Sequence, residues 1–129
     1  MKALSVRSSR RIELIDVTGE VGRAVRDSGV EEGVCLIYAP HTTAAVTINE
    51  NADPDVGRDV TMKLSQLVPR DEGYSHSEGN SDAHVKSSLV GCSVTVPVSD
   101  AQLVLGTWQA IYFCEFDGPR QRRLTVVVK

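Results

Sequence analysis

The sequence predicts an α+β fold, a single compact domain over residues 1–129 in which two or three helices pack on a large, mostly antiparallel β-sheet. The length of 129 residues is that of one domain, and 41% hydrophobic with 24% charged residues is ordinary for a globular chain. Short segments with alternating apolar side chains outnumber the helical patterns, and four of them follow one another at the C-terminal end. Such a succession of strands beside a few helices is typical of an α+β domain.

The strands are predicted from apolar residues that recur at every second position between turn-forming residues. Their expected ranges are residues 3–7, 11–17, 34–39, 41–49, 92–98, 102–105, 108–116 and 122–128. The first two are expected to pair as a hairpin through the polar turn at residues 8–10. The run at residues 34–39 is apolar throughout and is ended by Pro40, so we expect a central strand there.

Three helices are predicted from start and stop signals. Their expected N-terminal caps are Thr18, Asp53 and Ser81. Their expected ends are marked by Gly29, Pro69 and Gly91. The first helix has one apolar face, formed by Val21, Ala24 and Val25, which we expect to pack on the sheet. Residues 70–80 have no periodicity, and an unstructured loop of this length is often functional.

The composition disfavours two kinds of partner. Fourteen Lys and Arg against 17 Asp and Glu give a formal charge of −3, which disfavours nucleic-acid binding through net positive charge. No apolar run approaches the ~18–20 residues of a membrane span, so we expect a soluble, cytoplasmic protein. The three cysteines lie in apolar segments and form no CxxC pair, so we expect buried, reduced thiols at Cys35, Cys92 and Cys114.

The histidines and carboxylates suggest two possible metal sites. A zinc ion held by His41, His76 and His84, with an open fourth position, can polarise water or a substrate oxygen. The alternative is that each histidine is a hydrogen-bonded surface or structural residue. Glu50 and Glu78 are candidate magnesium ligands, because magnesium prefers carboxylate oxygens and bridges phosphates. Both metals stay open at this point.

Two segments are candidates for phosphate binding. The start of the third helix, at Asn80-Ser81, offers free backbone N–H groups and the positive end of the helix dipole. The densest basic cluster of the chain consists of Arg120, Arg122 and Arg123, and guanidinium groups suit phosphate oxygens. The alternative for the arginines is protection of an edge strand from aggregation. Glycine-rich nucleotide loops and nucleophile signatures are missing from the sequence.

Three stretches of the sequence resemble the signatures of the YjbQ family. The first runs from His41-Thr42-Thr43-Ala44 into Ile48-Asn49-Glu50-Asn51-Ala52-Asp53-Pro54-Asp55-Val56. The second is Glu78-Gly79-Asn80-Ser81-Asp82-Ala83-His84-Val85-Lys86-Ser87-Ser88-Leu89-Val90-Gly91, with His76 just before it. The third combines Gly106-Thr107-Trp108-Gln109 with Phe113-Cys114-Glu115-Phe116-Asp117-Gly118-Pro119-Arg120. The similarity covers essentially the whole chain.

The resemblance implies a YjbQ-like α+β fold assembled as a homotrimer, with the motif residues in pockets near subunit boundaries. Members of the family show thiamine-phosphate synthase activity, in which a pyrimidine methyl diphosphate is joined to a thiazole phosphate and pyrophosphate is released. This activity is regarded as secondary to a primary role that is unknown. The implied ligand is a small phosphorylated metabolite.

Two hypotheses follow for the function. In the first, the protein is an enzyme of phosphate-ester or diphosphate chemistry, with catalytic residues His41, Glu50 and His84. Phosphate oxygens are then held by Asn80, Ser81 and Arg120, while a zinc or magnesium ion neutralises the charge of the leaving group. In the second, the protein is a trimeric metal- or phosphate-binding protein without catalysis.

Overall fold

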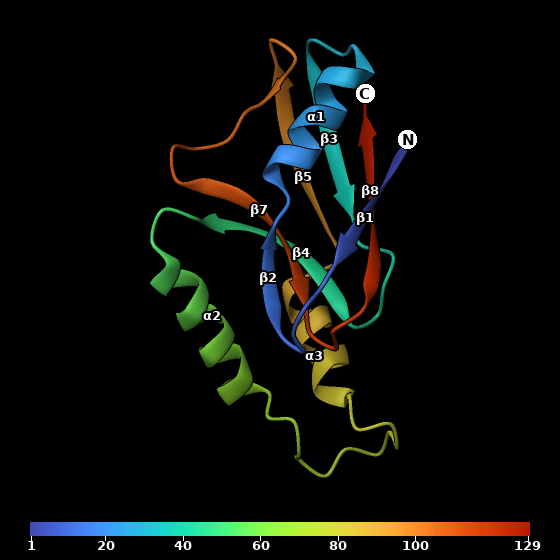
Figure 1. Cartoon of the computed structure of the whole chain (residues 1–129), viewed down its shortest axis with the longest axis vertical. Coiled ribbons are helices and arrows are strands. Elements are labelled where there is room, and N and C mark those ends of the chain that lie inside the picture. Colours follow the sequence, from blue (N-terminus) through green and yellow to red (C-terminus); the bar gives the residue numbers. More distant parts are fainter.

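The computed structural model describes residues 1–129 and contains eight strands and three helices (Figure 1). The helices are α1 (Thr18–Ser28), α2 (Pro54–Leu67) and α3 (Ser81–Val90). The strands are β1 (Lys2–Arg7), β2 (Glu13–Asp16), β3 (Gly33–Tyr38), β4 (Ala44–Glu50), β5 (Ser93–Ser99), β6 (Gln102–Leu103), β7 (Gln109–Glu115) and β8 (Gln121–Val128). All predicted elements are therefore present, with boundaries shifted by a few residues.

The strands form two sheets instead of the single large sheet that the sequence predicted. The five-stranded sheet has the order β1-β8-β3-β5-β6, the three-stranded sheet has the order β2-β7-β4, and every pairing is antiparallel. The antiparallel prediction is confirmed. β7 belongs to the three-stranded sheet and β8, the next strand, belongs to the five-stranded sheet, so the chain passes from one sheet to the other between them.

The predicted hairpin of the first two strands is wrong. β1 pairs with β8 and β2 pairs with β7, so the two strands lie in different sheets. The β1–β2 connection runs beside the β7–β8 connection: the amide of Ser8 donates to the carbonyl of Arg120 at 3.0 Å, and the amide of Gly118 donates to the carbonyl of Arg11 at 2.9 Å. Pairing with the distant strands β7 and β8 thus replaces pairing between β1 and β2.

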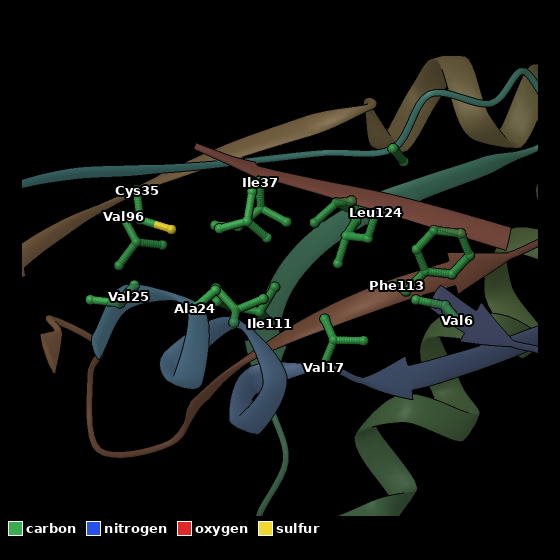
Figure 2. Packing of buried hydrophobic residues seen from close by; sticks show 14 of the residues in the cluster. Val6, Val17, Ala24, Val25, Cys35, Ile37, Val96, Ile111, Phe113 and Leu124 are labelled. Atoms are coloured by element: carbon green, nitrogen blue, oxygen red, sulfur yellow. The ribbon is translucent and has the colours of Figure 1, made fainter. Parts of the chain in front are cut away.

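The main hydrophobic core lies under α1, between this helix and the strands (Figure 2). Val21, Ala24 and Val25 are buried there, which confirms the predicted face of the first helix. Thr18 is not the cap of α1: its own amide and hydroxyl donate to Oδ1 of Asp16, at 2.9 and 2.6 Å. Asp16, at the end of β2, therefore holds the start of α1 instead.

The second and third helices lie at the other end of the molecule, beside the three-stranded sheet (Figure 1). Asp53 caps α2 as predicted, with Oδ1 accepting from the amide of Asp55 at 2.9 Å. Ser81 is the first residue of α3 and does not cap it, because Asn80 occupies the cap position. None of the three helices is long and apolar enough to cross a membrane.

Two of the three thiols are buried as expected and the third is not. Burial raises the pKa of Cys35 to about 11 and that of Cys114 to about 12. Cys92, in the turn between α3 and β5, is exposed. All three cysteines are free.

Candidate functional site

A hollow of about 740 Å³ lies at the N-terminal end of α3, and we call it the polar hollow. None of its lining residues is hydrophobic: they are Thr42, Thr43, Arg70, Glu78, Gly79, Asn80, His84, Asp117 and Arg120. They come from the β3–β4 connection, the loop before α3, α3 itself and the β7–β8 connection. Four segments far apart in the sequence thus meet in one pocket without an apolar wall.

The position of α3 is fixed by a buried ionic network. Asp82 is completely buried, and its carboxylate accepts two hydrogen bonds from the guanidinium of Arg11, at 2.9 and 3.1 Å. Nζ of Lys86, one turn later on α3 and 1% exposed, lies 3.2 Å from Oδ2 of Asp82. Burial by itself would raise the pKa of Asp82, but the hydrogen bonds from Arg11 and Lys86 outweigh it and lower this pKa. The carboxylate therefore stays ionised and ties the first turn of α3 to the β1–β2 connection.

Asp117 orients two of the polar side chains that line the hollow. Its Oδ2 accepts from Nδ2 of Asn80 at 2.9 Å and from the guanidinium of Arg120 at 3.2 Å. The side-chain amide oxygen Oδ1 of Asn80 is buried without a donor, which leaves an acceptor available to water or to a bound molecule. A Cβ on Gly118 would lie 2.7 Å from Oγ of Ser8, so the turn that carries Asp117 requires glycine at this position.

A second buried network supports Thr43, one of the two threonines of the hollow. The guanidinium of Arg122, 4% exposed, donates from Nε to Oε1 of the fully buried Glu115 at 2.9 Å. Its Nη2 donates to Oγ1 of Thr43 at 2.9 Å, and Ser8 donates to Glu115 at 2.7 Å. Burial by itself would raise the pKa of Glu115. The hydrogen bonds from Arg122 and Ser8 outweigh this effect, so the pKa of Glu115 lies below its ordinary value.

The predicted arginine cluster is therefore divided among three environments. Arg120 lines the polar hollow, Arg122 is buried against Glu115, and the side chain of Arg123 is exposed. The alternation of β8 explains this, because Arg122 shares its face with the buried Leu124 and Val126. That periodicity was visible in the sequence and could have separated Arg122 from its neighbours.

The side chain of His41 bonds to the backbone of β8 just beyond the end of the β3–β8 pairing. β3 ends at Tyr38, which pairs with Thr125, and beyond it Nε2 of His41 lies 3.0 Å from the backbone nitrogen and 3.1 Å from the carbonyl oxygen of Arg123. Burial and the nearby guanidinium of Arg122 lower the pKa of His41. Its imidazole is therefore neutral at neutral pH, with Nε2 engaged by the backbone.

The other two histidines lie against each other. The rings of His76 and His84 are edge to face with centroids 5.5 Å apart, and Nε2 of His76 lies 3.7 Å from the carboxylate of Glu78. The hydroxyl of Tyr74 donates to the carbonyl of Pro69 at 2.7 Å, which anchors the loop that carries His76. His84 thus reaches the polar hollow with His76 packed on its ring.

The single chain does not form the predicted metal sites. It contains no group of three or more His, Cys, Asp or Glu side chains that can hold a metal ion. Nε2 of His41 is used by β8, which separates this residue from the pair of His76 and His84. Glu50 lies at the far end of β4 from His41 and lines a different, largely apolar hollow with α2, so it does not meet Glu78. The residues of one chain therefore do not fit a zinc or magnesium ion.

The structure brings together part of the predicted site and adds residues to it. Asn80, His84 and Arg120 line the polar hollow, and Ser81 begins the helix at its edge. Sequence reasoning did not assign Arg70 or Asp117 to the site. Arg70 directly follows the proline that ends α2, and this position at the start of the long loop was the available signal.

The fold and the polar hollow define a small α+β protein with a pocket built from turn segments around a helix N-terminus. The chain belongs to the family described as UPF0047 protein YjbQ-like, which it matches over residues 2–129. It is 51% identical over 123 residues to a UPF0047 protein of Methanocaldococcus jannaschii, which covers 95% of this chain and 89% of that protein. The UPF0047 protein YugU of Bacillus subtilis is 50% identical over 123 residues, 95% of this chain and 93% of that one.

Two solved structures have the same fold. An uncharacterized conserved protein of the YjbQ/UPF0047 family from Clostridium acetobutylicum superposes with a TM-score of 0.98 at 47% identity, over 100% of both chains. A YbjQ-like protein of unknown function from Sulfolobus solfataricus superposes with a TM-score of 0.95 at 34% identity, over 98% of this chain and 94% of that one. The expected YjbQ-like α+β fold is confirmed, and these relatives assign no function.

Proposed function

We propose that the polar hollow binds the phosphate or diphosphate group of a small metabolite. His84 gives a proton to this group as its bond to the rest of the metabolite breaks. The observation that carries the proposal is the convergence of two arginines, an imidazole and the start of a ten-residue helix on one pocket without hydrophobic lining. Phosphate oxygens accept hydrogen bonds from guanidinium groups and from free helix N–H groups, and this pocket offers both.

Directional hydrogen bonds, and not net charge, carry the recognition. The lining contains two guanidinium groups and two carboxylates, so their formal charges cancel. Asp117, however, is already bonded to Asn80 and Arg120 and serves to orient them. The remaining donors are Arg70, the N–H groups of Arg120 that Asp117 does not use, the imidazole of His84 and the amides of Ser81 and Asp82 at the start of α3.

The reaction we propose first is the thiamine-phosphate synthase reaction. The bond between the methylene carbon of the pyrimidine and its diphosphate oxygen breaks, with the electron pair leaving on pyrophosphate, while the thiazole nitrogen forms the new bond to that carbon. Arg70 and Arg120 stabilise the charge that develops on the diphosphate, and His84 can give it a proton. No step requires a metal ion held by this chain.

A second candidate function is binding without catalysis. The absence of charge excess in the polar hollow and the engagement of His41 by the backbone favour it, since both leave few groups free for chemistry. Saturable binding of a phosphorylated metabolite, with no product found by mass spectrometry, would favour this candidate over the enzyme.

Replacing Arg120 by glutamine is expected to weaken the binding of inorganic pyrophosphate by about 10- to 100-fold, the usual effect of losing a charged hydrogen bond. Isothermal titration calorimetry measures it. Arg123→Gln is the matched control, because Arg123 lies three residues after Arg120, on β8, and its exposed side chain is outside the hollow. Equal affinities of the Arg120→Gln variant and the unchanged protein would remove Arg120 from the site.

We also propose that the protein is a homotrimer in solution. Val34, Leu36 and Tyr38 of the central strand β3 are 48, 37 and 42% exposed on the outer face of the five-stranded sheet, and α2 has no fully buried residue. Apolar surface of this kind is typical of subunit interfaces. Light scattering at micromolar concentration should give three times the mass of the chain, and a monomer would contradict the proposal.

A further inference from the structure

A second hollow, of about 670 Å³, adjoins the polar hollow. Thr42 and His84 line both hollows, so the imidazole of His84 stands at their boundary. The second hollow is otherwise formed mainly by the β3–β4 connection, the last two turns of α3 and the turn that follows α3, including His41, Ser87 and Cys92. We call it the neutral hollow.

The lining of the neutral hollow carries no Asp, Glu, Lys or Arg, in contrast to the polar hollow. Its polar groups are hydroxyls, a thiol and the two imidazoles. Burial and the guanidinium of Arg122 lower the pKa of His41, so this ring adds no positive charge at neutral pH. The surroundings therefore suit an uncharged group with hydrogen-bonding atoms better than a second phosphate.

One buried hydroxyl in this lining has no partner. Ser87 is 8% exposed, and its Oγ makes no hydrogen bond within the chain. The neighbouring Ser88 differs, because its hydroxyl donates to the carbonyl of His84 at 2.9 Å. Buried hydroxyls without partners are rare in proteins, and water or a ligand atom commonly completes them.

The geometry of α3 aims these groups at the neutral hollow. His84, Ser87, Ser88 and Gly91 follow one another at spacings of three, one and three residues, which places them on one face of the helix. Asp82 and Lys86, which hold α3 in place, are bonded to each other outside this hollow. The carbonyl of Cys92 accepts from the amide of Ala39 at 2.8 Å, so the turn that follows α3 is fixed as well.

We propose that the neutral hollow holds the uncharged organic part of the same substrate whose phosphate lies in the polar hollow. The ligand is then a phosphate or diphosphate ester of a small neutral group with hydrogen-bonding atoms. The ester bond crosses the boundary at His84, and Ser87 bonds the organic part. This inference rests on the proposed function and extends it to the substrate class.

Cys92 offers a direct readout of this hollow. It is the exposed thiol of the chain, whereas Cys35 and Cys114 are buried, so iodoacetamide is expected to label Cys92 selectively. The probes are 4-nitrophenyl phosphate, which has both parts, and inorganic phosphate, which has only one. We expect 4-nitrophenyl phosphate to suppress labelling in a saturable way and saturating inorganic phosphate to leave the labelling rate unchanged.

Replacing Ser87 by alanine gives a second measurement. The affinity for 4-nitrophenyl phosphate should fall about two- to tenfold, as for the loss of one neutral hydrogen bond, while that for inorganic phosphate stays the same. Ser65→Ala, on the remote helix α2, is the control and should change neither affinity. Equal melting temperatures of the variants confirm that folding is unaffected.

The outcomes separate the two proposals. If inorganic phosphate does not bind to the unchanged protein, the proposed function fails and this inference fails with it. If phosphate binds in a manner that depends on Arg120, but 4-nitrophenyl phosphate at saturation leaves Cys92 labelling unchanged, only the assignment of the neutral hollow is overturned. Equal weakening of both ligands by Ser87→Ala would also overturn it.

Discussion

Replacing Arg122 by alanine is expected to lower the free energy of unfolding by about 3–5 kcal/mol, because it leaves the carboxylate of Glu115 buried without its partner. Glu115 is fully buried, and its carboxylate receives hydrogen bonds from Arg122 and Ser8. The same guanidinium holds Thr43 at the wall of the polar hollow. A loss of this size is a large fraction of the stability of a small domain.

Urea denaturation at pH 7 measures the difference, and Arg123→Ala on the same strand is the control, with a change expected within about 0.5 kcal/mol.

The pH dependence of the stability difference gives a second check. The pKa of Glu115 is lower in the folded protein than its ordinary value of 4.5. The ionised carboxylate therefore stabilises the fold above pH 4.5, and this stabilisation is lost as the pH falls through the pKa of Glu115 in the folded protein. The stability difference should therefore shrink in acid. A pH-independent difference below 1 kcal/mol would contradict the buried pair.

Replacing His84 by glutamine is expected to lower the rate of pyrophosphate release about 10²- to 10⁴-fold, the usual contribution of a general acid or base. His84 belongs to the lining of the polar hollow and is the side chain there that can donate a proton to a departing phosphate oxygen. Glutamine keeps a hydrogen-bond donor of similar length, so pyrophosphate binding should weaken much less than turnover. A coupled assay of thiamine phosphate formation, together with calorimetry of pyrophosphate binding, separates these two effects.

His76→Gln is the matched control for this experiment. Its ring packs edge to face on His84 but does not line the polar hollow, so we expect a smaller loss of turnover. Undiminished turnover of the His84→Gln variant would remove His84 from the chemistry. Equal and complete loss in both variants, with a lowered melting temperature, would indicate a structural role for the histidine pair.

The sequence by itself determined the elements and their buried faces. Period-two segments became strands, and the apolar stripe of α1 is buried as Val21, Ala24 and Val25. The Asp53-Pro54 pair starts α2, and Gly91 ends α3. These features depend on side-chain periodicity and on the hydrogen-bonding and backbone preferences of single residues, which are local and can be predicted from the chain alone.

The sequence also placed Asn80, Ser81, His84 and Arg120 in the candidate site, and three of these four line the polar hollow. It placed Glu50 and His41 there as well, but β4 carries Glu50 away from the hollow, and the backbone of β8 engages His41. The number of residues between two side chains does not determine whether the fold brings them to the same end of a sheet.

Only the tertiary structure decided how distant segments meet. The β1–β2 connection runs beside the β7–β8 connection in space. This arrangement divides the strands into two sheets and places Ser8 beside Glu115. The buried pair of Asp82 and Arg11 joins residues 71 positions apart and sets the start of α3 at the polar hollow. Long-range pairing of this kind is selected by the total free energy of the packed chain, to which every segment contributes, so no local pattern encodes it.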